Sequence, residues 1–225
     1  MPEELWVAEL GQVPYREAVG LQARIRSERQ AGSVPDVLLL LEHPPVYTSG
    51  RRARSSDLPM GVEWYRTQGI EVSGSDRGGG GTYHGPGQLV GYPIMRVHDV
   101  PRYVHTVESV IIATLADEGI DAEVRDGLTG VWAGQSKIGS IGVHVSRGGT
   151  THGVAVNVDL DLQPFEWIVP CVMEGVRMTS VCKETGRSGG MPAFRERVAG
   201  RFAEAFDRLP PQVERRRLEA GGVPA

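Results

Sequence analysis

The sequence predicts a mixed α+β fold, and three patterns along the chain lead to that prediction. Val37 to Leu41 is an unbroken apolar run that leads into His43-Pro44-Pro45, which is typical of a buried strand entering a loop. Lys137 to Val158 reads as two strands joined by a turn. Arg102 to Glu118 carries apolar residues at helical spacing. Helices interspersed with hairpins favour this class over a regular parallel sheet.

The N-terminal elements follow in order. Leu5 to Leu10 is expected to be a short strand. Pro14 then stands where a helix can begin, because proline is well suited to the first helical turn. The helical spacing after it is carried by Tyr15, Ala18, Leu21 and Ile25. The apolar face of the second helix is formed by Val104, Val107, Val110, Ile111 and Leu115.

The C-terminal third is predicted to hold the hairpin, a third helix and a tail. Alternation over 137–145, a turn at 147–150 and a strand over 154–158 make up the hairpin. A helix from about Ala193 to Leu209 is ended by Pro210-Pro211. We therefore expect a single catalytic domain over residues 1–209 and a flexible tail over residues 210–225.

Composition narrows the function classes. The chain has 225 residues, a net charge of −4 and a pI near 5.9, which argues against nucleic-acid binding because that function needs a basic field. The N-terminus lacks the pattern of a secretory signal, and the longest apolar run is too short to span a membrane. The two cysteines, Cys171 and Cys182, make no disulfide framework. We expect a soluble cytoplasmic protein in which an unpaired cysteine can act as a nucleophile.

The densest signal lies in the glycine-rich segment from Asp76 to Gln88. Glycine lets the backbone approach a ligand closely, and a loop without function rarely keeps so many glycines, since they cost conformational entropy. The segment lacks the ending of a P-loop and the spacing of a dinucleotide fingerprint. A flexible surface loop is the alternative. Arg77, Tyr83, His84 and Gln88 among the glycines favour the wall of a binding site.

Four motifs resemble those of the lipoate-pathway octanoyltransferases, also called lipoyl(octanoyl) transferases. They are Arg77 to Tyr92 (Arg-Gly-Gly-x-x-Thr-Tyr-His-x-x-Gly-Gln-x-Val-x-Tyr), Glu42 to Gly50, Gly134 to Val143, and His152 to Asp159. The resemblance spans about residues 5 to 185, with the motifs in the family's order. It implies a biotin/lipoate protein ligase-like fold, a mixed β-sheet flanked by helices.

The resemblance also implies a catalytic pair, Lys137 and Cys171. Taken alone, Cys171 could be a buried packing residue and Lys137 a solvated strand residue. In the family, the lysine of this motif pairs with the cysteine that follows proline, and here those two residues are Lys137 and Cys171, which follows Pro170. A nearby ammonium lowers the pKa of a thiol, and a desolvated lysine can accept and return a proton. Cys182 is expected to be a packing residue.

The implied reaction moves an octanoyl group from octanoyl-acyl carrier protein to a lysine of a lipoyl domain through a Cys171 thioester. Lys137 would act as general acid and base, and backbone N–H groups would hold the oxyanion, each worth about 3 kcal/mol. No cofactor and no metal are expected. The implied acceptors are the lipoyl domains of 2-oxoacid dehydrogenase complexes and the glycine cleavage H protein, and neither nucleic acid nor membrane is expected as a partner.

The family's acyl-binding segments map onto three stretches of this chain. They are Arg77, Gly78, Gly79, Gly80, Gly81, Thr82, Tyr83 and His84; Gly139, Ser140 and Ile141; and His152, Gly153 and Val154. Glycines leave room for an alkyl chain, and Ile141 and Val154 supply apolar wall. His84 and His152 could instead be core histidines with satisfied hydrogen bonds, and His43 could simply brace its loop.

Two departures from the family pattern bear on the pocket. Val172 follows the cysteine where glycine is usual, and Gly139-Ser140 replace a more usual pair of alanines. These changes leave the preferred acyl chain length open.

Two other functions compete with transfer. An ATP-dependent lipoate or biotin protein ligase resembles this family in fold but needs no cysteine. A carrier-protein binding module without chemistry would not need Lys137 and Cys171. Because acyl carrier protein is acidic, a basic patch is expected near the pocket opening despite the net negative charge, with Arg51, Arg52, Arg54 and Arg125 as candidates. A run of solvated surface charges without a partner is an equally weighted alternative.

Overall fold

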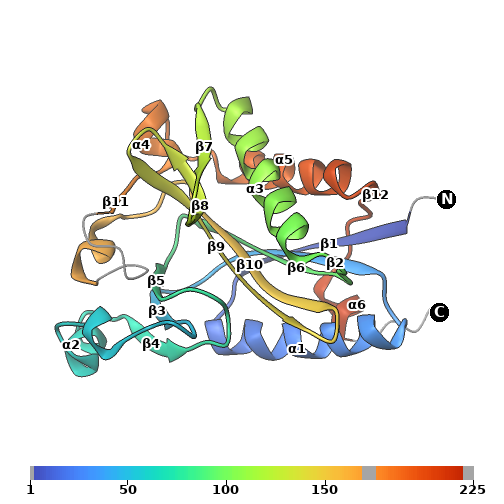
Figure 1. The fold of residues 1–225 in the computed structure, drawn as a ribbon, viewed down its shortest axis with the longest axis horizontal. Helices are drawn as coiled ribbons and strands as arrows, with labels where there is room; N and C mark the ends of the chain where they lie inside the picture. Colours follow the sequence, from blue (N-terminus) through green and yellow to red (C-terminus); the bar gives the residue numbers. More distant parts are fainter. Residues whose placement is uncertain (1–2, 169–175, 220–225) are drawn as a thin grey trace.

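The computed structural model describes residues 3–168 and 176–219, and its frame is a mixed sheet with helices on both faces (Figure 1). Among these residues, eight strands follow the order β12 (Arg208–Leu209), β1 (Glu3–Gln12), β2 (Asp36–Glu42), β6 (Gln88–Ile94), β10 (Gly149–Asn157), β9 (Ser136–Ser146), β8 (Leu128–Ala133) and β7 (Ala122–Arg125). The pairs β12–β1 and β1–β2 are parallel, and the pairs from β2 to β7 are antiparallel. The predicted α+β class and mixed sheet are confirmed.

A smaller sheet lies beside the main one. It consists of β4 (Glu71–Gly74), β3 (Val46–Ser49) and β5 (Gly81–His84), with β3 parallel to β4 and antiparallel to β5. Short helical turns accompany this end of the molecule: η1 (Ser55–Asp57), α2 (Val62–Thr67), η2 (Gln163–Trp167) and α4 (Val181–Thr185). The two-residue strand β11 (Arg177–Met178) pairs with β9 in parallel.

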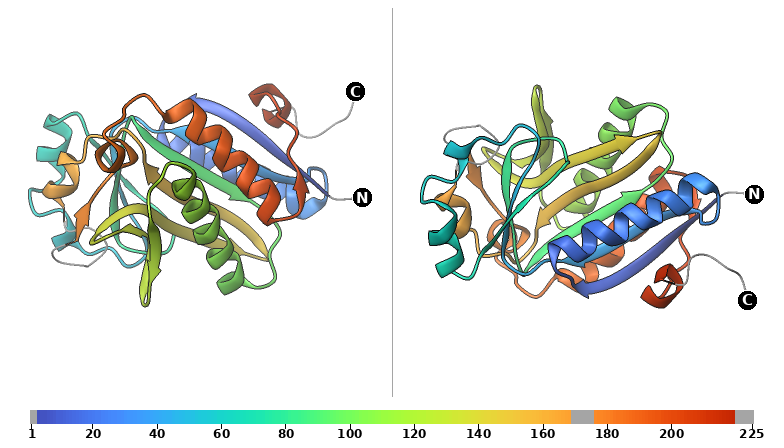
Figure 2. Two further views of the ribbon diagram at one scale, coloured as in Figure 1. Left: turned by 90° about the horizontal axis from the view of Figure 1, so that it is seen from above. Right: turned by 90° about the horizontal axis from the view of Figure 1, so that it is seen from below.

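Helices cover the two faces of the main sheet, as Figure 2 shows from opposite sides. One face is covered by α1 (Tyr15–Ala31) and the short α6 (Arg215–Glu219), and the other by α3 (Val100–Asp117) and α5 (Met191–Ala205). Helix α3 begins at an Asp99 N-cap, whose carboxylate accepts from the Arg102 N–H at 3.0 Å. In the described part of the chain, no helix combines the length and apolar character needed to cross a membrane.

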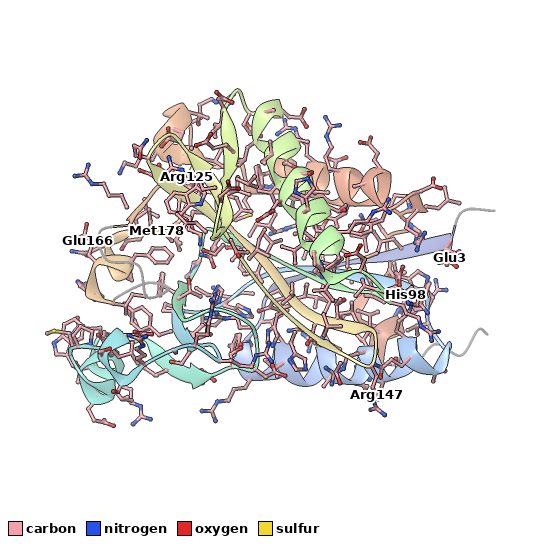
Figure 3. The ribbon with its side chains drawn as sticks, in the orientation of Figure 1. Glu3, His98, Arg125, Arg147, Glu166 and Met178 are labelled. Atoms are coloured by element: carbon pink, nitrogen blue, oxygen red, sulfur yellow. The ribbon has the colours of Figure 1, made fainter. Side chains whose placement is uncertain are left out.

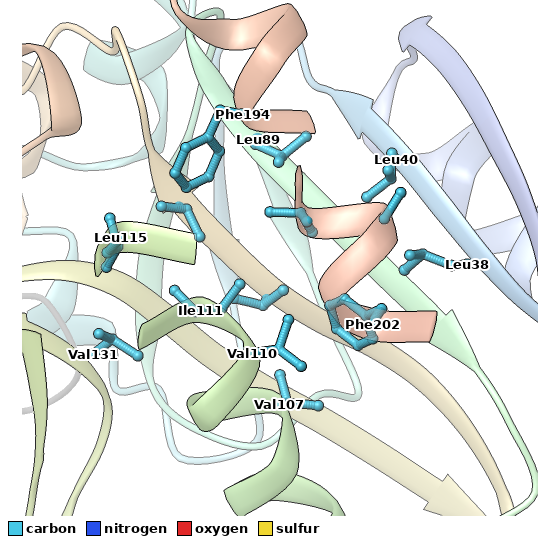
Figure 4. Packing of buried hydrophobic residues seen from close by; sticks show 14 of the residues in the cluster. Leu38, Leu40, Leu89, Val107, Val110, Ile111, Leu115, Val131, Phe194 and Phe202 are labelled. Atoms are coloured by element: carbon cyan, nitrogen blue, oxygen red, sulfur yellow. The ribbon is translucent and has the colours of Figure 1, made fainter. Parts of the chain in front are cut away.

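The apolar run of β2 is buried because the strand packs on both faces. Leu38 and Leu40 face the cluster formed with α3 and α5, where Figure 4 places them near Phe202 and Leu89. Val37, Leu39 and Leu41 point the other way, toward α1, as the alternation of a strand requires. The centre of the sheet is therefore covered on both faces, next to the strands that build the site.

The predicted third helix and tail differ from the structure. Helix α5 ends at Ala205, and Asp207 adopts a left-handed φ of 50°, which turns the chain so that Arg208 and Leu209 pair with β1. Gln212 bridges to Val7, and the Val213 N–H donates to the Val7 carbonyl at 2.8 Å. Val213 and Leu218 are buried, so residues 212–219 pack on the sheet where a loose tail was expected.

Candidate active site

A cavity with a volume of about 590 Å³ lies between the β9–β10 hairpin, β5, β6 and the start of α1. Its walls are formed by Tyr15, Arg52, Arg54, Arg77, Gly79, Thr82, His84, Val90, Tyr92, Gly127, Leu128, Thr129, Lys137, Ser140, Ile141, Gly142, His152, Gly153, Val154 and Ala155. His152 on β10 pairs across the hairpin with Val143 on β9. Val143 is six residues from Lys137 along β9, which corresponds to about 20 Å of strand. The cavity is therefore elongated, with Lys137 toward one end and His152 toward the other.

Most residues of the three predicted binding segments line this cavity. Those that do are Arg77, Gly79, Thr82, His84, Ser140, Ile141, His152, Gly153 and Val154, together with Lys137. Those absent from the cavity wall are Gly78, Gly80, Gly81, Tyr83 and Gly139. Tyr83 alternates with its neighbours on β5 and packs against Tyr47 and Phe165 instead, and burial raises its pKa to about 12.

A Cβ at Gly139 would meet Val131 and Ile111, which places this position against the core. Cys171 lies outside the described residues. The segments just before and after it are described: Glu166 and Met178 lie at the same end of the molecule, opposite Glu3 and Arg147 (Figure 3).

Lys137 is a buried lysine with only 3% of its surface exposed. Its Nζ donates to the Thr129 carbonyl at 2.9 Å and lies 5.7 Å from the centre of the Trp132 ring. Gly130 makes room for this side chain, because a Cβ there would lie 2.5 Å from Lys137 Cε. The amine is thus held inside the cavity wall by β8, the strand beside it.

The glycine-rich loop is held by backbone hydrogen bonds on two sides. The N–H groups of Gly50, Arg51 and Arg52 donate to the carbonyls of 80, 77 and 79. On the other side, the Gly78 N–H donates to the Val143 carbonyl at 3.0 Å. A Cβ at Gly50 would lie 2.6 Å from the Gly79 carbonyl oxygen, so the close approach of the two loops requires glycine.

Arg77 braces the loop from within. Its Nη2 donates to both the carbonyl and the hydroxyl of Thr48, each at 2.8 Å, and its Nη1 donates to the Gly78 carbonyl at 3.0 Å. Arg77 is 7% exposed and also lines the cavity. It therefore joins the small sheet to the cavity wall as a fixed positive charge.

His43 and His84 are neutral residues of the buried interior. Burial lowers the pKa of His43 to about 4, although the hydrogen bond to the Val13 carbonyl opposes this. The carbonyl accepts at 2.6 Å, so Nδ1 carries the hydrogen, and Nε2 accepts from the Tyr92 hydroxyl at 2.7 Å. Burial, followed by the effects of His43 and Arg77, lowers the pKa of His84 well below its usual value. His43 thus braces the loop before Pro44, as its position suggested.

His152 occupies an unusual backbone position. Its φ is 58°, and its N–H donates to Gln22 Oε1 of α1 at 2.6 Å. Its Nε2 lies 2.6 Å from Asp76 Oδ1, so this nitrogen donates to the carboxylate. Burial lowers the pKa of His152, partly offset by Asp76. The arrangement places the ring in the cavity wall, 6.1 Å from the Tyr92 ring centre.

Several cavity residues were not singled out from the sequence. They are Tyr15, Val90, Tyr92, Gly127, Leu128, Thr129, Gly142 and Ala155. Val90, Tyr92, Gly142 and Ala155 lie within quoted motifs and could have been found there. Tyr15 follows a core periodicity, which predicts burial without indicating that a cavity lies beside it.

Two further observations concern residues discussed from the sequence. Arg52 and Arg54 are exposed and also line the cavity, so they lie at its opening. Cys182 lies away from the cavity, half-buried in a shallow groove with Asp159. A hydrogen bond to Asp159, followed by burial, raises the pKa of this thiol, which disfavours its thiolate.

Comparison with known proteins agrees with these motifs. Residues 14–203 match the family model described as the lipoyl protein ligase A/B catalytic domain. The chain is 45% identical over 216 residues to an octanoyltransferase of Roseiflexus sp. (strain RS-1), covering 93% of this chain and 90% of the relative. It is 46% identical over 200 residues to an octanoyltransferase of Rubrobacter xylanophilus, covering 87% of this chain and 90% of the relative.

Solved structures share the fold at lower identity. A lipoate protein ligase from T. acidophilum with bound lipoic acid gives a TM-score of 0.76 at 19% identity, covering 99% of this chain and 93% of that one. A biotin protein ligase from Aquifex aeolicus gives 0.53 at 12% identity, covering 91% and 70%. The chain thus belongs to the lipoyl protein ligase A/B catalytic domain family, and within it to the octanoyltransferases, which are acyltransferases.

Proposed function

We propose that this chain transfers an octanoyl group from octanoyl-acyl carrier protein to a lysine of a lipoyl domain through a thioester on Cys171. The observation that carries the proposal is the buried amine of Lys137 in the wall of an elongated cavity of about 590 Å³. Glycines and apolar residues along β9 and β10 suit a straight alkyl chain. The octanoyltransferase relatives support the same reaction.

The reaction has two halves. The Cys171 thiolate attacks the thioester carbonyl, the new C–S bond forms, and the carrier's thiol leaves with a proton returned by Lys137. The acceptor amine then attacks the acyl-enzyme and forms an amide, the C–S bond to Cys171 breaks to release its thiolate, and Lys137 accepts the amine's proton. Both halves balance without ATP or another co-reactant.

The cavity residues bind and orient the acyl chain in this proposal. His84 takes no part in proton transfer, because its pKa is far below neutral and its Nδ1 hydrogen is donated to Gln88 Oε1 at 2.7 Å. His152 is about 20 Å along the strand from Lys137, so it contacts the far part of the substrate. Among the cavity residues, the proposal therefore assigns proton transfer at the reacting carbonyl to Lys137.

The proposed partners are an acidic acyl carrier protein and lipoyl domains. The lipoyl domains are those of 2-oxoacid dehydrogenase complexes and the glycine cleavage H protein, and the proposed compartment is the cytoplasm. Arg51, Arg52 and Arg54 are exposed and form no ion pair with any described residue, so they can meet an acidic partner. The structures sharing this fold include one from work on a bipartite lipoate protein ligase of Thermoplasma acidophilum and its E2 lipoyl domain.

Intact-protein mass spectrometry tests the proposal. The protein is mixed with octanoyl-acyl carrier protein and then chased with an apo lipoyl domain. We expect one octanoyl group on the peptide containing Cys171, cleared by the chase as the lipoyl domain gains the same mass. Cys182→Ser is expected to behave like wild type, and Cys171→Ser to lose transfer.

An ATP-dependent ligase is the alternative outcome of the same experiment. Structures that share this fold include a lipoate-protein ligase bound with ATP. Modification of the lipoyl domain only when ATP and free octanoate are supplied, with no Cys171 adduct, would replace the transferase mechanism by adenylation.

A further inference from the structure

Lys137 lies where β9 changes its neighbouring strand. Along one edge of β9, the pairing with β10 ends at the pair formed by Val156 of β10 and Gly139 of β9. Beyond that point β11 takes the place of β10, and Met178 pairs with Lys137. The Thr179 N–H donates to the Lys137 carbonyl at 3.0 Å. On this edge the main chain of the lysine is therefore held by a strand that is only two residues long, while on the other edge Lys137 pairs with Trp132 of β8.

Asn157 joins the two strands at this change. Its Nδ2 donates to the Thr179 carbonyl at 2.9 Å, and its Oδ1 accepts from Gln88 Nε2, also at 2.9 Å. Asn157 is 2% exposed, and Gln88 and Thr179 are each 1% exposed. It is the only asparagine in the sequence. Both ends of its amide are thus committed inside the protein.

The backbone carbonyls fix the orientation of both amides. The backbone carbonyls of Thr179 and Tyr83 can only accept hydrogen bonds. The side-chain nitrogen of Asn157 must therefore face Thr179, and that of Gln88 must face Tyr83. Gln88 Oε1 therefore accepts from His84 Nδ1, and His84 Nε2 faces the Thr48 hydroxyl at 3.4 Å. The Thr48 hydroxyl oxygen accepts from Arg77, so its hydrogen is directed at His84 Nε2. Each group in the chain from Arg77 through Thr48, His84, Gln88 and Asn157 therefore donates to the next, and the chain ends at the Thr179 carbonyl.

We propose that Asn157 and Gln88 are positioning residues for the acyl transfer, acting by holding β11 against the main chain of Lys137. Neither residue is among the described residues that line the cavity. The inference rests on the proposed roles of Lys137 and Cys171. Because Met178 and Thr179 also follow the segment that carries Cys171, loosening β11 would displace the lysine relative to the thiol.

Asn157→Asp isolates the contact with Thr179. The aspartate keeps an acceptor for Gln88 but places an oxygen against the Thr179 carbonyl. In a Cys182→Ser background, we expect faster hydrogen exchange for the peptide covering 177–180. We also expect kcat to fall about 100-fold with KM for the octanoyl donor nearly unchanged, since small displacements of reacting groups have effects of that size.

The pH profile of Cys171 alkylation separates positioning from stability. If β11 sets the distance between lysine and thiol, the apparent pKa of alkylation by iodoacetamide rises toward about 8.5 in Asn157→Asp. Gln68→Glu makes the same chemical change on an exposed residue, and Val198→Ala lowers stability from the far face of the sheet. Both controls are expected to keep the wild-type profile.

Two results would overturn the inference. An Asn157→Asp variant with wild-type kcat and alkylation profile would overturn it alone, even if its melting temperature fell. Failure of the Cys182→Ser parent to take an octanoyl group on Cys171 would remove the proposed function and this role with it. Acylation of the Cys182→Ser parent is therefore measured first. If the parent is acylated, a wild-type result for Asn157→Asp overturns only the positioning role.

Discussion

At the scale of single residues, the site depends on how closely β8 approaches Lys137. Gly130 has a φ of 126°, and a Cβ there would lie 2.5 Å from Lys137 Cε and 2.6 Å from the Gly139 carbonyl oxygen. Both the backbone conformation and the space therefore favour glycine. The lysine side chain cannot keep its bond to the Thr129 carbonyl if Gly130 gains a side chain.

We predict that Gly130→Ala lowers octanoyl transfer by about 100-fold by displacing Lys137. The backbone strain alone should cost about 1–3 kcal/mol of stability. Gly119→Ala is the matched control, because Gly119 has a φ of 80° and nothing within 4 Å of an added Cβ. Steady-state transfer and thermal melts of the two variants provide the comparison. Equal activity in both would show that the contact with Lys137 is unimportant.

At the scale of elements, the C-terminal segment seals one face of the sheet. Leu218 of α6 is 2% exposed and belongs to the same core cluster as Trp6 and Leu21. Arg217 lies over the Trp6 ring at 4.1 Å from its centre. Although α6 has only five residues, it completes the packing of β1.

We predict that Leu218→Ala destabilises the protein by about 2–5 kcal/mol, the usual range for a buried leucine. Leu209→Ala, at a position 54% exposed, should change stability by at most about 0.5 kcal/mol. Denaturant unfolding measures both values. If the two variants had the same stability, residues 212–219 would not be packed in solution.

At the scale of the whole molecule, the free energy of unfolding should depend on buried neutral histidines. His43 has a pKa of about 4 in the folded protein against about 6.5 when unfolded, and the pKa values of His84 and His152 are also lowered. Between these values the unfolded chain binds more protons than the folded one. Stability is therefore complete above about pH 6.5 and is lost as the pH falls toward 4.

We predict that His43 alone accounts for about 2 kcal/mol of stability lost between pH 7 and pH 5. His43→Asn keeps a donor for the Val13 carbonyl but cannot be protonated. The variant should be less stable at pH 7 yet lose less stability on acidification, as measured by urea unfolding at both pH values. An identical loss in the two proteins would contradict the assignment.

Much of the main frame could be predicted from the sequence because periodicity reports burial directly. The β2 run, the helix after Pro14 and the β9–β10 hairpin each carry such a pattern. The packing of residues 212–219 on the sheet could not be predicted, because the burial of Leu218 depends on Trp6 at the other end of the chain. The replacement of β10 by β11 is likewise invisible, because a two-residue strand has no period.

The cavity was only partly predictable for a related reason. Residues next to glycine, such as Arg77 and His152, lie in motifs that differ from ordinary core. Val90 and Ala155 have the residue types of any buried strand, and only the packing of the small sheet against β6 and β10 leaves space beside them. Sequence patterns indicate which residues are buried, but the space between elements depends on the whole assembly.

The burial of Asn157 also affects the chemical ageing of the protein. Asparagine deamidates when the following backbone nitrogen attacks its side-chain carbonyl, and here that nitrogen, in Val158, donates its hydrogen to the Gly87 carbonyl at 3.1 Å. The side-chain amide is itself bonded at both ends. Since the chain has no other asparagine, its durability against this form of damage depends on one site, protected for as long as the fold persists.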